Sequence, residues 1–232
     1  MGIETATDAC AVALYKNEQI LALEFTQKPK IHSQSLTLFI EKVLSEVNIP
    51  IYELSAVVVS AGPGSYTGLR IGMSTAKGIA YALDIPLMLI PSTAVAAYAG
   101  LDKIPNPDGI LVGVIDAPYH DVYLQFFEYG LFFLNPITEP QHYVLDNHIL
   151  LPYLKQDKLL YLIGKGANKI KEYYNEYKNV IPLENVSQNM RNIGYWLLES
   201  YLANHFVDLE QAQPLYVKDF MPTIRAKKSS KK

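Results

Sequence analysis

The chain has 232 residues, of which 50% are apolar and 19% charged, a composition typical of a folded globular protein rather than a disordered or coiled-coil one. Its 20 basic and 23 acidic residues give a net charge of −3, which argues against a protein that holds nucleic acid mainly by neutralising phosphates. The single cysteine, Cys10, can form neither an intramolecular disulfide nor a multi-thiolate zinc site, so a reducing, cytoplasmic location is expected. The apolar stretch 78–100 is interrupted by Asp84, Pro86 and Pro91 and is not expected to cross a membrane as one helix.

The first half of the chain predicts strands before helices. Three short strands should form a β-meander, at residues 3–7, 11–15 and 20–26. A helix follows, capped by Ser33 or Ser35 and ending near Val47, with Leu36 and Ile40 on its apolar face. The chain should then return to the sheet.

This return is a continuous β-branched run at 56–59, which is typical of a strand buried on both faces. A glycine-rich turn, a helix over about 68–83 and a short strand at 87–90 come next. Three strands, a helix, a strand, a helix and a strand are the element order of a ribonuclease-H-like unit. Residues 1–104 are therefore predicted to be one such lobe.

A second unit of the same kind begins after the proline-rich break at 105–107. Its predicted strands are residues 109–115, 122–127, 131–137 and 159–163, and a late helix covers 190–203. Two such units are the architecture of the actin-like ATPases, an α/β fold, and the second lobe, 105–224, has shorter helices. Residues 225–232 form a basic tail that is expected to be disordered.

The most informative segment is the turn from Ser60 to Gly72. Its glycines permit positive φ angles, and Ser65 or Thr67 can cap the helix that follows. Glycines before a helix can also hold an anion, but the spacing matches neither the dinucleotide fingerprint nor the P-loop. A tight turn that positions the helix is the favoured interpretation.

The same segment resembles a family signature. Residues 62–72, followed by Ala76 to Ala80, are similar to the GPGSFTGLRIG…AKGLA pattern of the TsaB/YeaZ family, with Tyr66 in place of phenylalanine. Further similarities occur in family order and cover nearly the whole chain: Glu4–Thr7 with Cys10, His32–Ser33, Asp116–Ala117 with Val122–Tyr123, 164–167 and 214–218. Pro118 departs from the family's usual arginine, and the chain begins unusually close to Glu4.

The resemblance implies a non-catalytic subunit with a fold paralogous to TsaD, the catalytic subunit of the Kae1/Gcp family. Such a subunit binds and organises TsaD, with TsaE joining through the complex, for N6-threonylcarbamoylation of adenosine 37 in ANN-decoding tRNAs. A homodimer in isolation is possible, tRNA would be contacted only indirectly, and no membrane is involved. The motif turn carried over from the family comprises Gly62, Pro63, Gly64, Ser65, Thr67, Gly68 and Arg70.

The residues themselves do not predict catalysis. The five histidines include no pair four apart that one helix could present to a metal. Glu4, Thr5 and Asp116 occupy the places of the two phosphate loops, but Pro118 removes an amide that a phosphate would need. We therefore expect vestigial loops, no catalytic residue, no metal and no cofactor. The alternative is an ATP-dependent small-molecule kinase or ATPase of the same superfamily.

The helix over 68–83 is the predicted partner interface. Arg70, Ser74, Lys77 and Tyr81 share one polar arc, and the remaining arc is wider than a sheet needs. Within it, small residues recur every fourth position, which would let a partner helix approach closely; the alternative is that they pack inside the protein. The predicted interface residues are Leu69, Gly72, Met73, Ala76, Ile79, Ala80 and Leu83, with Leu36 and Ile40.

Overall fold

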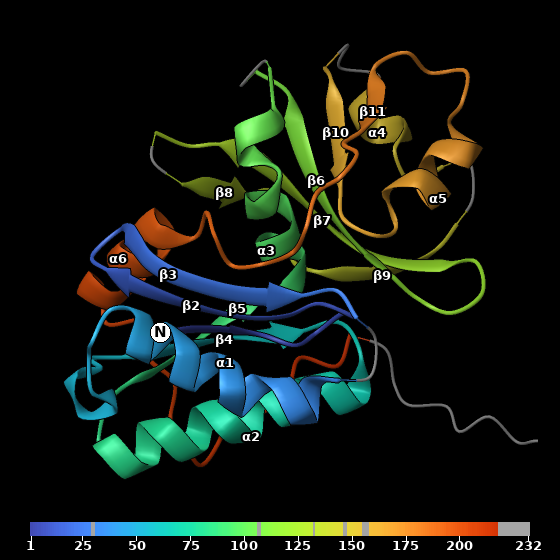
Figure 1. Cartoon of the computed structure of the whole chain (residues 1–232). Helices are drawn as coiled ribbons and strands as arrows, with labels where there is room; N and C mark the ends of the chain where they lie inside the picture. Colours follow the sequence, from blue (N-terminus) through green and yellow to red (C-terminus); the bar gives the residue numbers. More distant parts are fainter. Residues whose placement is uncertain (29–30, 106–107, 132, 146–147, 155–157, 218–232) are drawn as a thin grey trace, which may run out of the picture.

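The structure is a computed structural model that describes residues 1–28, 31–105, 108–131, 133–145, 148–154 and 158–217. It contains two sheets of the same topology (Figure 1). The first has the order β3-β2-β1-β4-β5, in which β1 pairs antiparallel with β2 and parallel with β4. Its strands are β1 (Gly2–Glu4), β2 (Cys10–Lys16), β3 (Gln19–Thr26), β4 (Val57–Gly62) and β5 (Leu87–Pro91).

The second sheet repeats this arrangement with the order β11-β10-β6-β7-β8, and β9 pairs with β7. Again an antiparallel meander is followed by parallel strands, because β6 pairs antiparallel with β7 and parallel with β10. Its strands are β6 (Ile110–Asp116), β7 (Asp121–Tyr129), β8 (Leu134–Pro136), β9 (Gln141–Val144), β10 (Leu160–Ile163) and β11 (Val180–Pro182). The predicted actin-like α/β architecture of two ribonuclease-H-like lobes is confirmed.

The helices differ in length between the lobes. In the first lobe α1 (His32–Glu46) and α2 (Tyr66–Leu83) cover the outer face of the sheet (Figure 1). In the second lobe the helices are α4 (Leu151–Leu154) and α5 (Ala167–Tyr173), with four and seven residues. Two short 3-10 turns, η1 (Ile51–Glu53) and η2 (Leu101–Lys103), complete the connections.

A helix that the sequence pattern did not predict, α3 (Ser92–Ala99), lies between the sheets and contacts strands of both. Residues 92–98 are all buried, so the helix has no polar face and its periodicity gives no signal. Its alanines allow close contact with β6. A Cβ atom on Gly113 would lie 1.9 Å from the carbonyl oxygen of Thr93, so only glycine allows this approach.

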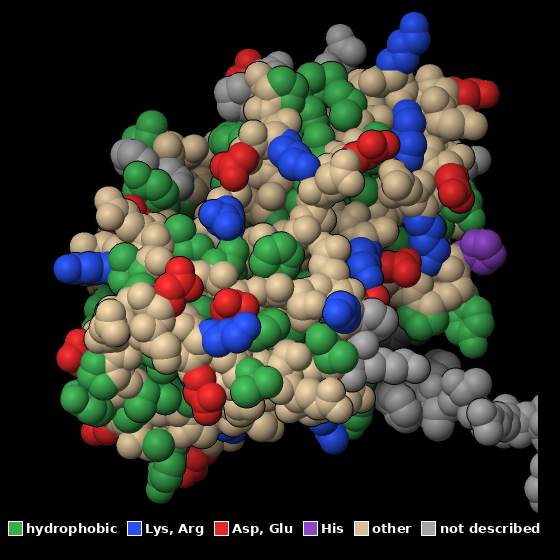
Figure 2. Space-filling view, viewed as in Figure 1, with side chains coloured by type: hydrophobic (Ala, Val, Ile, Leu, Met, Phe, Trp, Pro, Cys, Tyr) green, Lys and Arg blue, Asp and Glu red, His purple; other side chains and the backbone are tan. Residues whose placement is uncertain are grey.

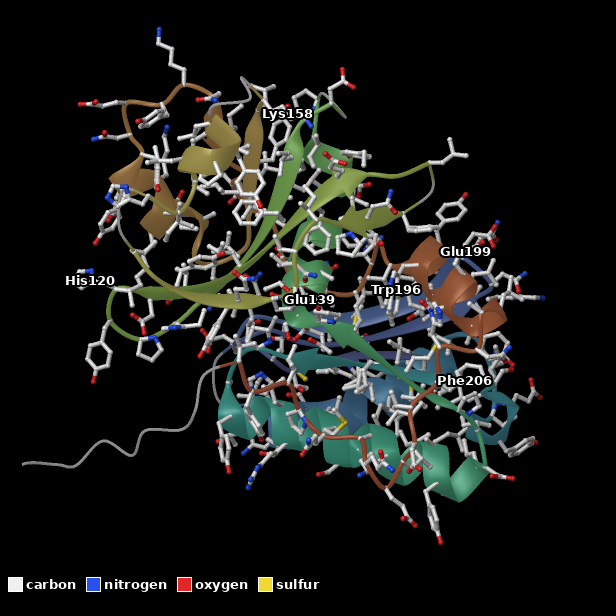
Figure 3. The ribbon with its side chains drawn as sticks, turned by 180° about the vertical axis from the view of Figure 1, so that it is seen from behind. His120, Glu139, Lys158, Trp196, Glu199 and Phe206 are labelled. Carbon is white, nitrogen blue, oxygen red and sulfur yellow. The ribbon has the colours of Figure 1, made fainter. Side chains whose placement is uncertain are left out.

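The last described residues return to the first lobe. Helix α6 (Gly194–Leu202) is followed by a segment in which Val207 bridges to Leu87 and the Leu215 amide donates to the Ala61 carbonyl at 2.7 Å. Figure 3 shows α6 with Trp196 and Glu199 beside the first sheet, with Phe206 below them. This segment was expected to belong to lobe 105–224, but it packs on the first lobe. The division near residue 104 remains a proposal, and tail 225–232 lies outside the described residues.

Several element ends differ from the sequence prediction. Helix α1 begins at His32 after Ile31, which makes no side-chain cap, so capping by Ser33 or Ser35 is wrong. Helix α2 begins at Tyr66, two residues earlier than expected, and Ser65 caps it as predicted. The strands expected at 3–7 and 131–137 span only Gly2–Glu4 and Leu134–Pro136.

Candidate functional site

The motif turn between β4 and α2 holds the first hairpin turn against the helix. The Ser65 amide donates to the Ala6 carbonyl at 2.6 Å, and Ser65 Oγ accepts from the Gly68 amide at 3.2 Å. A Cβ atom on Gly64 would lie 2.1 Å from the Ala6 carbonyl oxygen, and one on Gly68 would lie 2.1 Å from that of Thr5. The glycines are needed because two backbone segments touch there, which supports the interpretation as a structural turn.

Glu4 lies inside the protein rather than at a phosphate loop. Its carboxylate accepts from the Ala6 amide at 2.5 Å and from Gln188 Nε2 at 2.9 Å, and it is fully buried. Burial raises the pKa of the Glu4 carboxyl to about 7, although the hydrogen bond from Gln188 opposes this shift. Thr5 is also buried, and its hydroxyl donates to the Gly68 carbonyl at 2.8 Å. Neither side chain reaches an open cavity.

A cavity of about 450 Å³ opens between the lobes, next to the motif turn. Asp8 and Lys165, one from each lobe, both line it and form an ion pair. Asp116 also lines the cavity, and Lys169 Nζ donates to Asp116 Oδ1 at 3.1 Å and to the Ala117 carbonyl at 2.8 Å. The structure thus brings Asp116 to the cavity beside the motif turn, whereas the side chains of Glu4 and Thr5 are buried away from the cavity, that of Thr5 against Gly68 of the turn.

The predicted interface strip on α2 faces inward. Gly72, Ala76 and Ala80 are buried, and a Cβ atom on Gly72 would lie 2.2 Å from Thr5 Oγ1. Ala76 and Ala80 belong to the core between the first sheet and α1. Leu69, Met73, Leu36 and Ile40 are buried as well, while Ile79 and Leu83 are half-buried. The interface prediction is wrong for the seven buried residues, because the apolar arc of the helix is wide and the sheet and α1 cover this part of it.

A different strip of small residues faces solvent. Ser74, Gly78 and Ala82 are exposed and also recur every fourth position, and a Cβ atom on Gly78 would meet no atom within 4 Å. Tyr81 beside this strip is 81% exposed, and Leu38 on α1 is 55% exposed. We call Ser74, Gly78 and Ala82 the outer strip. The spacing of small residues is the same in both strips, and only Ser74, which the sequence analysis placed on the polar arc, distinguishes the outer strip from the buried one.

The histidines and the cysteine have structural surroundings. His142 Nε2 lies 2.8 Å from Asp121 Oδ2, a pairing that sequence reasoning missed, and His32 Nε2 lies 2.8 Å from the Thr7 carbonyl oxygen. Burial raises the pKa of the Cys10 thiol to about 11. Within the described ranges, no cluster of three or more His, Cys, Asp or Glu side chains could hold a metal ion, and no helix is long and apolar enough to cross a membrane.

The fold and these sites define a two-lobed protein of the actin-like ATPase class. A sequence model of the family described as "TsaD: tRNA N6-adenosine threonylcarbamoyltransferase" matches residues 19–194. Among relatives, the TsaB biosynthesis protein of Buchnera aphidicola subsp. Schizaphis graminum is 32% identical over 74% of this chain and 80% of its own length. That of Bacillus subtilis is 29% identical over 70% of this chain and 69% of its own length.

The Escherichia coli TsaB protein is 30% identical, but the match spans only 53% of this chain and 52% of that protein. Among solved structures, YeaZ from Pseudomonas aeruginosa has a TM-score of 0.81 and 21% identity, over 93% of this chain and 97% of that one. This structural likeness shows the fold. The chain belongs to the TsaB/YeaZ family, within the group that the TsaD model describes.

Proposed function

We propose that this chain is the non-catalytic subunit of a tRNA-modifying complex, in which it binds and organises TsaD, with TsaE, for N6-threonylcarbamoylation of adenosine 37. Family membership carries this proposal, because the relatives are named as tRNA threonylcarbamoyladenosine biosynthesis proteins. The reaction chemistry then belongs to the partner, and this chain contributes a surface.

The non-catalytic part of the proposal is supported by the first phosphate-loop region. There the Ala6 amide already donates to the Glu4 carboxylate, and the Ser65 amide donates to the Ala6 carbonyl. The Glu4 carboxylate is also buried against Gln188. A phosphate would have to displace these hydrogen bonds, and a buried carboxylate cannot coordinate a metal ion in the cavity. In the second loop region Asp116 is exposed at the cavity, but its carboxylate is already paired with Lys169.

The outer strip of α2 is the surface we assign to TsaD. Ser74, Gly78 and Ala82 leave a flat face on which a second helix can lie at short distance. The exposed side chain of Tyr81, three residues after Gly78 on the same helix, lies beside it and offers area to bury. Docking there leaves the core of this chain unchanged, whereas the buried strip could be reached only by unfolding.

The experiment is to mix Gly78→Arg with TsaD from the same organism and follow co-elution by size-exclusion chromatography. The variant should fold normally, because a side chain at residue 78 meets no atom and arginine has a higher helix propensity than glycine. It should lose co-elution, because the long cation would hold the helices apart and be desolvated without a partner. Glu199→Arg on α6 adds the same side chain to an exposed site on another face and should co-elute like the wild type.

Reconstitution tests the whole proposal. Threonylcarbamoyladenosine should form on tRNA only when this chain is present with its partners, and Gly78→Arg should lower the yield in proportion to the lost complex. If Gly78→Arg co-elutes with TsaD like the wild type, the outer strip is not the interface. If omission of this chain leaves the yield unchanged, the proposed function is wrong.

A further inference from the structure

Three side chains from distant parts of the chain meet at the N-terminal end of α2. Tyr66 and Arg70 come from the first turns of the helix, and Tyr216 comes from the segment after α6. Arg70 Cζ lies 4.2 Å from the centre of the Tyr66 ring, and the centres of the two tyrosine rings are 5.6 Å apart at an angle of 31°. Arg70 Nε donates to the Tyr216 hydroxyl at 3.4 Å. We call these residues the Tyr66–Arg70–Tyr216 cluster.

All three side chains of the cluster are partly exposed to solvent. Tyr66 is 44% and Tyr216 is 46% exposed, and Arg70 is exposed too. Attachment of the C-terminal segment to the first lobe does not need this cluster. The Leu215 amide already donates to the Ala61 carbonyl at 2.7 Å, and Lys77 Nζ donates to the Ala212 carbonyl at 3.0 Å. Two aromatic rings and a guanidinium plane are thus held in place by other bonds while remaining accessible.

The surroundings favour an anionic partner. The N-terminal end of an α-helix carries a partial positive charge, and Tyr66 lies in the first turn of α2. In the inter-lobe cavity that Tyr66 also lines, the charges are already paired, Lys165 with Asp8 and Asp116 with Lys169, so the described residues of the cavity add no unpaired negative charge beside the cluster. By sequence, residues 218–232 begin two positions after Tyr216 and contain six of the 20 basic residues of the chain but one acidic residue. Figure 2 shows basic and acidic side chains mixed over the visible face.

Aromatic rings and arginine planes next to cationic groups are the combination that binds unpaired bases. Bases stack on tyrosine and on guanidinium, while the basic groups contact the phosphates. We propose that the Tyr66–Arg70–Tyr216 cluster stacks an unpaired base of single-stranded RNA, such as the loop of a stem–loop. This direct contact differs from the expectation that the chain meets tRNA only indirectly. It does not depend on the proposed binding of TsaD.

The test measures binding of the isolated full chain to a fluorescein-labelled stem–loop RNA with a seven-nucleotide loop, by anisotropy at low salt. We expect saturable binding that Tyr216→Ala weakens about tenfold, as expected for the loss of one stacking surface. Tyr216→Trp should restore it. Arg70→Lys, which keeps the charge but loses the plane, should weaken binding nearly as much as Arg70→Ala. Tyr81→Ala is the matched control, since Tyr81 is exposed on the same helix, about 22 Å along the helix axis from Tyr66.

A second RNA separates stacking from charge. A stem–loop of the same length whose loop nucleotides lack bases should bind the wild type about as weakly as the normal RNA binds Tyr216→Ala. Removal of residues 225–232 should lower the salt dependence of binding but leave the preference for loops with bases. Equal affinity for the two RNAs, equal losses in Tyr81→Ala and Tyr216→Ala, or no saturable binding would each overturn the proposal. Melting temperatures within about 2 °C of the wild type confirm that the variants are folded.

Discussion

Glu4 and Gln188 stand 184 positions apart in the chain, yet Gln188 Nε2 donates to Glu4 Oε2 at 2.9 Å inside the protein. The same amide lies 3.2 Å from the carbonyl oxygen of Ser92 at the start of α3. This hydrogen bond therefore joins β1, the helix between the sheets and the segment that leads to α6. It involves a carboxyl group that burial makes difficult to ionise.

The first prediction concerns the pH dependence of stability. Because folding raises the pKa of Glu4 to about 7, the folded state binds a proton that the unfolded state releases near pH 4.5. The stability that protonated Glu4 contributes is fully present below about pH 4.5 and is lost as the pH rises through about 7. Summed over the range, the loss is about 3 kcal/mol. Glutamine cannot ionise, so the Glu4→Gln variant should not show this pH-dependent loss of stability.

Urea unfolding of wild type and Glu4→Gln at pH 5, 6, 7 and 8 measures the difference. The unfolding free energy of Glu4→Gln should increase relative to that of the wild type as the pH rises. Glu24→Gln, at a partly exposed pair with Lys42 on the first lobe, is a control that should follow the wild type. Parallel curves for wild type and Glu4→Gln would show that Glu4 does not titrate in this range.

The second prediction compares two glycines of α2. Gly72→Ala should destabilise the protein by about 1–3 kcal/mol, because the new Cβ atom would collide with Thr5 Oγ1, whose hydroxyl bonds Gly68. Gly78→Ala should stabilise it by up to about 1 kcal/mol, because it gains helix propensity and meets no atom. Thermal unfolding of the two variants measures both. If the signs were reversed, the helix would be rotated from the described orientation.

The third prediction concerns the cap of α2. Ser65→Ala removes the side-chain oxygen that accepts from the Gly68 amide, and this should cost about 1 kcal/mol of unfolding free energy. Thr67→Ala, at an exposed position in the same turn, should change it by less than about 0.5 kcal/mol. Equal losses would indicate that the cap makes no specific contribution. Denaturant unfolding at pH 7 resolves a difference of this size.

The fourth prediction concerns Tyr161, which is fully buried on β10. Among the described residues, its hydroxyl has no hydrogen-bond partner. Tyr161→Phe should therefore raise the unfolding free energy, by about 1 kcal/mol or more, since it removes a buried polar group and keeps the ring. A matched change, Tyr174→Phe, removes a hydroxyl that accepts from the Leu150 amide at 3.1 Å and should lower stability. A loss in Tyr161→Phe would point to a bound water at this hydroxyl.

The fifth prediction is that the purified chain does not hydrolyse ATP. The amides of the first loop region are engaged, and Pro118 offers none in the second. Calorimetric titration with Mg-ATP should give no saturable heat, and phosphate release should stay at background. Turnover that survives re-purification and rises with protein concentration would support the alternative of an actin-like kinase or ATPase.

The sequence by itself determined the elements whose signals are local. The β-branched run of β4, the alternating meander before it and the Ser65 cap of α2 depend on neighbours within a few residues, so their patterns could be interpreted directly. The family followed from the motif turn for the same reason. The shorter helices of the second lobe could also be predicted, because a short helix has a short stretch of helical periodicity in the sequence.

The tertiary structure alone decided which side of α2 is covered. Gly72, Ala76 and Ala80 have the same spacing as the outer strip, and the apolar arc of the helix is too wide for periodicity to show which part of it the sheet covers. Burial depends on where β4 and α1 lie, which periodicity does not contain. The pairs Glu4 with Gln188 and Tyr66 with Tyr216 were hidden for a similar reason: chain topology brings them together, and no sequence spacing encodes a contact across 150 or more residues.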